Sequence, residues 1–321
     1  MTCDISVVGP LNIDLIMRGD GPSNWDSIPT WDGPANMEMI AAGSVGYTVT
    51  NLARLGLAVR VSSCLPDDPL GVFVQTALSR SGVDTRLVRM MPDTLGGIGV
   101  YMLLFGSNKR PLAYRLPTHE LWPLEFTPAE VESLLDARVL HHGGYLHFKE
   151  SWHGAVVNLF QAAREKGLLT TVDPQFPLFP MPSPWIVGLV DLLPLTNILF
   201  CDESEARSIT AASDLDTAAA QLLSAGPELI IIKQGAQGST LYRQGWKHHQ
   251  PAVALGEVVD TIGAGDTYDA GFLYGTLQGW TVERCALFAA IAAGFSVTGI
   301  GGSSALPDIE TILAEMRRAA V

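Results

Sequence analysis

From about residue 127 to the end of the chain, short apolar runs rich in β-branched residues alternate with stretches of helical periodicity. The apolar runs have the length and composition of buried strands and lie at 138–147, 168–173, 197–202 and 228–235. Strands that alternate with helices in this way form a mostly parallel sheet with helices on both faces. The sequence therefore predicts an α/β fold of three layers.

The first part of the chain departs from this alternation. The segments at about 14–42 and 96–117 are rich in strand-forming residues but have no helices between their strands. We expect them to pair as a small β-sheet that acts as a lid, discontinuous in sequence. The length of 321 residues allows one large domain or two smaller ones. We predict a single domain over residues 1–321.

The composition restricts the kinds of partner. Acidic residues outnumber basic ones, 33 against 20, and the net charge of −13 argues against a nucleic-acid or membrane-surface binder. Hydrophobic residues make up 47% of the chain, enough for a large core. The four cysteines have no metal-binding or redox spacing, and the N-terminus has no signal-peptide pattern. We expect a cytoplasmic protein with a small-molecule substrate.

The stretch DTIGAGDTYDAGF, residues 260–272, places small residues directly before Asp266 and a predicted helix. Small residues let backbone N–H groups approach a ligand, and a helix N-terminus favours an anion. Asp266 could then serve as a general base. The chain has no Walker A motif, and a dinucleotide fingerprint would need glycine at Tyr268. The remaining alternative is a helix-capping aspartate after a tight turn.

Residues 260–266 match the Asp-Thr-x-Gly-Ala-Gly-Asp signature of the ribokinase-like (PfkB-type) carbohydrate kinases at every fixed position. Other segments resemble that family over most of the chain: VVGPLNIDLI, AAGSVGYTVTNLARLG, LPDDPLG, DESEA and KQGAQGS. The resemblance implies a ribokinase-like fold and a kinase that uses ATP and Mg²⁺.

The resemblance also implies roles for individual residues. Asp266 would be the catalytic base, and Gly263, Ala264 and Gly265 would donate N–H groups to the transferring phosphoryl group. Acceptor-binding positions are Asn12, Asp14 and Gly43, and nucleotide-binding positions are Lys233, Gly235 and Gly238. Lys233 could equally be a solvent-exposed lysine at a strand end. Glu205 would bind Mg²⁺ through water, with Asp202 beside it. Asp260 and the carbonyl of Ile262, with the loop at 299–304, could hold K⁺.

Three departures from the family pattern bear on the acceptor. Tyr47 stands where many members have an acceptor-binding asparagine, and it could stack on a ring or donate one hydrogen bond. Asp202 replaces the asparagine of the Asn-x-x-Glu segment. The segment that begins at Asp173 lacks the usual later arginine. Arg18, Lys109, Arg110 and Arg115 could bind a phosphorylated acceptor, but we expect an unphosphorylated one.

The leading hypothesis is an ATP-dependent kinase acting on a hydroxyl of a sugar or sugar-like molecule. A nucleoside kinase on the same fold and a catalytically silent ligand-binding or regulatory protein remain open as alternatives. The histidines of 141–153 could bind a metal, although a strand would turn them to different faces, and we expect one of them to touch the substrate instead. An exposed edge of the small sheet leads us to expect a homodimer.

Overall fold

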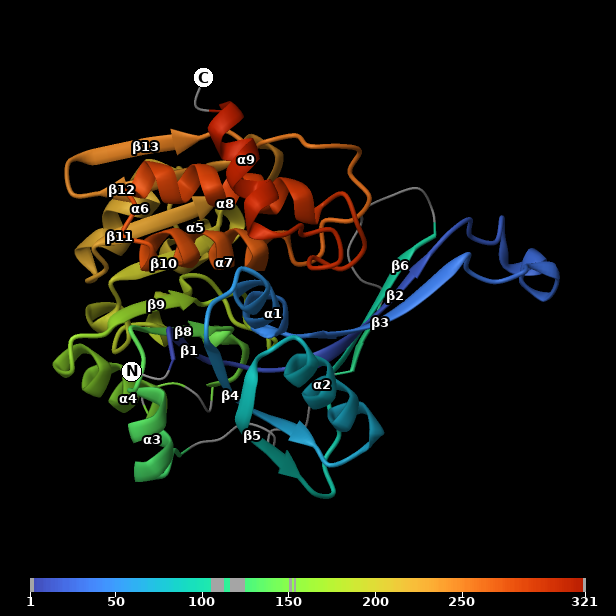
Figure 1. Cartoon of the computed structure of the whole chain (residues 1–321), viewed down its shortest axis with the longest axis horizontal. Helices are drawn as coiled ribbons and strands as arrows, with labels where there is room; N and C mark the ends of the chain where they lie inside the picture. Colours follow the sequence, from blue (N-terminus) through green and yellow to red (C-terminus); the bar gives the residue numbers. More distant parts are fainter. Residues whose placement is uncertain (1–2, 105–112, 116–124, 150–151, 153, 320–321) are drawn as a thin grey trace.

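A computed structural model of the chain describes residues 3–104, 113–115, 125–149, 152 and 154–319. Among these residues the strands form two sheets, one large and one small (Figure 1). No helix in the described part of the chain is long and apolar enough to span a membrane.

The large sheet has nine strands in the order β13-β12-β11-β10-β9-β8-β1-β4-β5. Pairing is parallel from β5 through β11 and antiparallel for β12 and β13. The prediction of a mostly parallel sheet is therefore confirmed. The strands are β1 (Ile5–Val8), β4 (Val59–Pro66), β5 (Asp84–Met91), β8 (Val139–Gly143), β9 (Leu169–Asp173), β10 (Ile198–Asp202), β11 (Leu229–Lys233), β12 (Ser239–Arg243) and β13 (Trp246–Gln250).

Helices cover both faces of this sheet. Helices α1, α2, α7 and α8 pack on one face, and helices α3 to α6 pack on the other. The helices are α1 (Gly46–Arg54), α2 (Pro69–Arg80), α3 (Pro128–Leu134), α4 (Ala155–Glu165), α5 (Glu203–Thr210), α6 (Leu215–Ser224), α7 (Ala264–Leu277), α8 (Val282–Ser296) and α9 (Ile309–Ala319). Short 3₁₀ turns are η1 (Trp25–Thr30), η3 (Tyr145–His147), η5 (Trp185–Gly188), η6 (Leu193–Leu195) and η7 (Gly235–Gln237).

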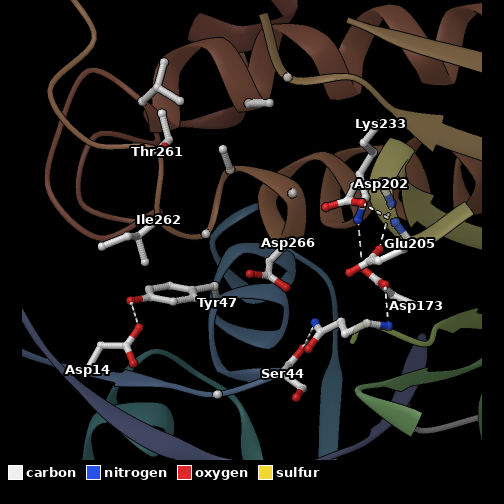
Figure 2. Close-up of a pocket in the computed structure, with 18 of the residues that line it drawn as sticks. Asp14, Ser44, Tyr47, Asp173, Asp202, Glu205, Lys233, Thr261, Ile262 and Asp266 are labelled. Carbon is white, nitrogen blue, oxygen red and sulfur yellow. Dashed lines mark hydrogen bonds and ion pairs between the residues drawn. The ribbon is translucent and has the colours of Figure 1, made fainter. Parts of the chain in front are cut away.

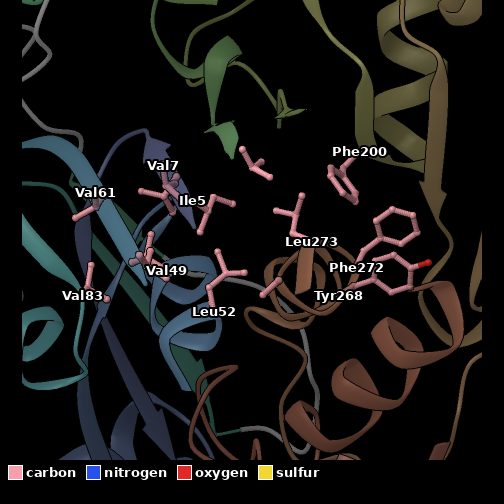
Figure 3. Packing of buried hydrophobic residues seen from close by; sticks show 14 of the residues in the cluster. Ile5, Val7, Val49, Leu52, Val61, Val83, Phe200, Tyr268, Phe272 and Leu273 are labelled. Atoms are coloured by element: carbon pink, nitrogen blue, oxygen red, sulfur yellow. The ribbon is translucent and has the colours of Figure 1, made fainter. Parts of the chain in front are cut away.

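The central strands explain why the core has two halves. Along β11, Ile231 points into the cluster beneath α7, whereas Ile230 and Ile232 point into the cluster beneath α5 and α6. Successive strand residues face opposite sides, so a strand with helices on both sides is apolar at every position. Figure 3 shows the first cluster, in which Phe200 of β10 meets Phe272 of α7 edge to face, with ring centroids 5.7 Å apart.

The small sheet has the order β3-β2-β6-β7, from β2 (Asn12–Arg18), β3 (Asn36–Ala42), β6 (Ile98–Leu103) and β7 (Ala113–Arg115). Its strands come from the two segments expected to pair, and within the second segment β6 and β7 are antiparallel. Figure 1 shows β2, β3 and β6 projecting away from the large sheet. Because β2 follows β1 after a three-residue turn, the small sheet begins at the rim of the large one.

Glycine residues let α7 lie close to α8. A Cβ on Gly271 would be 2.9 Å from the Cα of Ala289, so the two helix backbones approach more closely than a larger residue would allow. This close packing places α7 directly against α8.

Candidate active site

A cavity of about 880 Å³ lies where the carboxyl ends of the parallel strands meet the small sheet. Asp173, Asp202 and Lys233 are the last residues of β9, β10 and β11, and all three line it. In open α/β sheets, ligands bind at this end of the strands. Figure 2 shows side chains from both sheets and from the N-terminus of α7 converging on the cavity.

The N-terminus of α7 opens into this cavity. Gly263 is the N-cap with φ of 73°, and Ala264, Gly265 and Asp266 form the first turn, as the signature predicted. All four residues line the cavity. Because the first N–H groups of a helix have no intrahelical acceptor, this turn can bind an anionic oxygen. Asp266 places a carboxyl beside these N–H groups in the first turn of the helix.

Tyr47 joins the helix N-terminus to the small sheet. Its hydroxyl donates a 2.7 Å hydrogen bond to Oδ2 of Asp14 on β2. A Cβ on Gly263 would lie 2.9 Å from the Tyr47 ring, so glycine is needed there both for its positive φ and for this contact. Burial and the neighbouring Asp14 raise the pKa of Tyr47 well above its usual range, which keeps the hydroxyl a donor. The single hydrogen bond expected of Tyr47 thus goes to a side chain of the protein.

The other two residues proposed to bind the acceptor are Asn12 and Gly43. Asn12 lies on β2, as Asp14 does, and all three residues line the cavity. Gly43 has φ of +95°, and a Cβ there would lie 2.7 Å from the backbone N of Asn12. Glycine at this position is therefore required by the close passage of the chain's own backbone.

Lys233 is neither a solvent-exposed lysine nor a free cation. Its ammonium forms ion pairs with Asp173 at 2.7 Å and with Asp269 at 3.0 Å, and its side chain is only 13% exposed. It lies beside the helix N-terminus, since a Cβ on Gly265 would be 3.5 Å from Nζ. Asp269 was missed in the sequence, although its place three residues after Asp266 puts it on the same side of α7.

The pKa values of the two aspartates in this cluster are shifted in opposite directions. Burial opposes ionisation of Asp173, but Lys233 and a hydrogen bond from Asp269 overcome it and lower the pKa of Asp173. Burial and the Asp173 charge instead raise the pKa of Asp269 well above its usual range. Lys233 and the hydrogen bond from Asp269 thus both favour the ionised form of Asp173.

Asp202 and Glu205 form a capping box at the start of α5. Asp202 accepts from the Glu205 backbone N–H, and Glu205 accepts from the Asp202 backbone N–H, each at 2.7 Å. Burial, followed by the charges of Asp173 and Asp202, raises the pKa of Glu205 to about 8. Such an excess of carboxylate oxygens at one end of a cavity suits a hard divalent cation that keeps some of its waters. The described residues contain no cluster of three or more metal-ligating side chains, so these two carboxylates fit Mg²⁺ as ligands that act through its waters.

Asp260 connects the two loops expected to form a cation site. It is fully buried and accepts from the backbone N–H of Ile262 at 2.9 Å and of Gly301 at 2.8 Å. The loop at 299–304 is thus held against the start of α7. Ile262 lines the cavity, whereas Asp260 is not among its lining residues.

The far end of the cavity is apolar. It is lined by Gly235 and Ala236 of η7, by the segment 252–256 with Val258, and by small residues of α8. Gly238 is not among the lining residues, and its φ of +97° instead lets the turn pass the backbone at 250–252. The segment 252–258 was not predicted, because it carries no charged or motif residue apart from Glu257.

Of the histidines at 141–153, His147 lines the cavity. His141 is buried in the sheet with Nδ1 2.9 Å from the Thr171 hydroxyl, and His142 packs edge to face with Tyr145. His153, Lys109 and Arg110 lie outside the described residues, as does the side chain of Arg115. Arg18 is exposed on β2 and is not among the lining residues.

Comparison with known proteins agrees with this geometry. The model of the pfkB family carbohydrate kinases matches residues 3–309, nearly the whole chain. The chain belongs to this family. As a member of this family it is a sugar kinase, that is, a phosphotransferase with an alcohol group as acceptor.

Individual relatives are more distant. The chain is 26% identical over 287 residues to the 5-dehydro-2-deoxygluconokinase of Shouchella clausii, and the aligned region covers 85% of each protein. The structure of Arabidopsis thaliana ribokinase complexed with ribose and ATP superposes with a TM-score of 0.81 over 99% of both chains at 22% identity. A ribokinase II from E. coli in complex with ATP and Mg²⁺ gives 0.78 at 19% identity, over 98% of this chain and 99% of that one. At these identities the two structures establish the ribokinase fold.

Proposed function

We propose that this kinase transfers the γ-phosphoryl group of ATP to a hydroxyl of a sugar or sugar-like small molecule. The observation that carries the proposal is the place of Asp266, in the first turn of α7 and on the wall of the cavity. A base beside unsatisfied helix N–H groups is what hydroxyl attack on a phosphoryl group requires.

In the proposed reaction, Asp266 takes the proton of the acceptor hydroxyl as its oxygen attacks the γ-phosphorus. The bond between the γ-phosphorus and the bridging oxygen to the β-phosphate breaks, and ADP leaves. The N–H groups of Gly263, Ala264 and Gly265 would stabilise the negative charge on the transferring group. Most of the catalysis would come from positioning and charge stabilisation, as in other phosphoryl transfers.

Glu205 and Asp202 would hold Mg²⁺ through water near the phosphates. When bound, the ion neutralises charge on the β- and γ-phosphates. The proposal is supported by the carboxylate excess at this end of the cavity and by the ATP and Mg²⁺ in the E. coli structure.

Nucleotide and acceptor would occupy opposite ends of the cavity. The adenosine end would be the apolar region with Gly235 and the segment 252–256, while Gly238 shapes the turn behind it. The acceptor end would be Asn12, Asp14 and Gly43. Lys233 would act indirectly on the phosphates, because two carboxylates already bind its ammonium.

Potassium remains a prediction at the junction of 260–262 and 299–304. The carbonyl of Ile262 and the backbone of the second loop would supply the oxygens, and Asp260 would keep the two loops together. A several-fold rise in turnover when KCl replaces NaCl at constant ionic strength would support a K⁺ site, and equal rates would remove it.

A nucleoside acceptor is the second candidate. Tyr101, Phe148 and Phe176 line the acceptor end, and aromatic rings can stack on a base.

The test is ADP release from Mg·ATP across a panel of ketoses, aldoses, polyols, sugar acids and nucleosides. Wild type is compared with Asp266→Asn and with the control Asp214→Asn, which alters an exposed helix cap outside the cavity. Activity with one acceptor class that is lost in D266N and kept in D214N supports the proposal. If wild type binds ATP but turns over nothing, the silent-protein alternative takes its place.

We also propose a homodimer formed through the small sheet. β3 is the edge strand of this sheet in the described residues, and Met37 and Met39 on it are 59% and 42% exposed. Exposed apolar residues on a strand edge favour pairing with a second copy. Light scattering should give twice the monomer mass for wild type and the monomer mass for Met37→Lys/Met39→Lys.

A further inference from the structure

His147 is a polar group in the cavity wall that the mechanism above does not use. It ends η3, directly after β8, and its Nδ1 lies 3.0 Å from the hydroxyl of Ser44. Its Nε2 is buried and has no hydrogen-bond partner in the described residues. The side chain packs near Phe148 and Phe176, which line the same cavity.

The orientation of the His147 ring is fixed by its surroundings. Gly144 has φ of +73°, and a Cβ there would lie 2.2 Å from the Ser44 hydroxyl oxygen and 3.2 Å from Nδ1 of His147. The contact between Ser44 and His147 therefore depends on a glycine beneath it. With Nδ1 engaged by Ser44, Nε2 is the ring nitrogen without a partner among the described residues.

The chemistry of Nε2 suits a hydroxyl. Burial lowers the pKa of His147 to about 4, so the ring is neutral at pH 7. A neutral imidazole donates from one nitrogen and accepts at the other, and the Ser44 hydroxyl can serve either tautomer. A ligand hydroxyl can likewise donate or accept, whereas a carboxylate or phosphate would call for a cation.

Asn12 provides a second polar atom of this kind. Its Oδ1 is buried without a partner in the described residues, and the residue lines the cavity from β2. Leaving a buried polar atom unpaired is unfavourable, so both atoms favour a ligand that supplies hydroxyl groups.

The charges at this end of the cavity point the same way. Among the described lining residues, Lys233 is the only lysine or arginine, and Asp173 and Asp269 bind its ammonium. The acceptor end also contains the carboxylate of Asp14. An anionic acceptor would therefore meet like charge.

On the basis of the kinase activity proposed above, we propose that His147 is a specificity-determining residue that hydrogen-bonds through Nε2 to a hydroxyl of an uncharged polyhydroxylated acceptor. Ser44 is a positioning residue that orients the ring. The acceptor class is a neutral sugar or polyol with at least one hydroxyl besides the one that is phosphorylated.

Two substitutions at His147 separate this role from a structural one. The amide of glutamine reaches the place of Nε2, whereas the amide of asparagine reaches only the place of Nδ1. We expect His147→Asn to lower kcat/KM for the acceptor roughly 10- to 100-fold, the effect of losing one hydrogen bond in a dry site, and to leave KM for ATP unchanged. His147→Gln should recover most of the loss. The control is His249→Asn, an exposed histidine on β13 that also contacts a hydroxyl, that of Thr240.

Deoxy analogues of the best acceptor identify the contact. For wild type, kcat/KM should be much lower with the analogue that lacks the hydroxyl bound by His147 than with the parent acceptor. For H147N, kcat/KM should be the same with that analogue and with the parent acceptor. Ser44→Ala should weaken this discrimination without abolishing it.

The possible failures are distinguishable. One outcome is that wild type turns over the acceptor but each missing hydroxyl lowers kcat/KM by the same factor in H147N as in wild type. This would overturn the role of His147 and leave the kinase activity intact. Preference for a carboxylated or phosphorylated acceptor over its neutral counterpart, with 5-dehydro-2-deoxygluconate included in the panel, would overturn the uncharged class. Absence of turnover with any acceptor would remove the proposed function and this inference with it.

Discussion

Replacing Lys233 by methionine tests how charge is balanced in the buried cluster beside the helix N-terminus. Lys233 contacts Asp173 at 2.7 Å and Asp269 at 3.0 Å, and these carboxylates are about 5% and 1% exposed. Removing one partner of a buried ion pair typically costs about 3–5 kcal/mol, because the remaining charge has lost its counterion. We expect the free energy of unfolding of K233M at pH 8 to fall by about that amount.

The loss should depend on pH in a definite direction. Without the lysine, burial would raise the pKa of Asp173 in the folded state above its unfolded value of about 4. A carboxyl with a raised folded pKa stabilises the protein at low pH, and that stability is lost as pH rises through the folded pKa. The cost of K233M should therefore be smaller at pH 5.5 than at pH 8. Urea unfolding followed by tryptophan fluorescence at both pH values measures it.

Two further variants make the test specific. Asp269→Asn replaces the carboxyl whose pKa is raised by an amide of the same shape, so it should cost less than K233M. Lys233→Met/Asp173→Asn removes both charges and should recover much of the stability lost in K233M. The reasoning is refuted if D269N is as destabilised as K233M, or if the cost of K233M is the same at both pH values.

Other expectations follow from the same geometry. Gly263→Ala would force a Cβ against the Tyr47 ring and the backbone of Gly302 at a positive φ, so kcat should fall at least 100-fold while the urea midpoint drops. Tyr47→Phe removes the donor to buried Asp14 and should cost about 1.5–3 kcal/mol in urea unfolding, with altered acceptor preference as a second readout. Because the pKa of Glu205 is raised to about 8, Mg²⁺ must displace a proton there, and the Mg²⁺ concentration for half-maximal rate should fall between pH 6.5 and 8.5; a flat profile, or the same slope in Glu205→Gln, would contradict this.

The parts of the fold predicted from the sequence are those where local patterns carry the information. Residues 263–266 carry a local signature of small residues before an aspartate and a helix, and the structure places them at the start of α7 on the cavity wall. The alternation of β11, where Ile230 and Ile232 face one core and Ile231 the other, is visible as an unbroken apolar run. Such features depend on neighbours in the sequence, which a single chain displays.

The parts not predicted depend on contacts between distant residues. Asp269 and Asp173 are 96 residues apart in the numbering, and nothing in either local stretch indicates that both meet Lys233. The sequence also did not indicate that Tyr47 would contact Asp14, because the two residues meet only after β2 has folded into the small sheet. For Lys233 the sequence left two alternatives, and both missed that its charge is taken up within the protein.

The charge balance of the cavity leads to one further prediction, about the form in which ATP binds. Asp14, Asp173, Asp202 and Asp266 line it, and Glu205 adds a further negative charge above its pKa of about 8, against Lys233 as the only lysine or arginine among the described lining residues. A polyanion such as ATP would be repelled by this set unless it arrived with a cation that neutralises part of its charge. Helix N–H groups offer a site for phosphate but only partial charge. We therefore expect free ATP to bind much more weakly than Mg·ATP, with the difference reduced when Glu205 is replaced by glutamine.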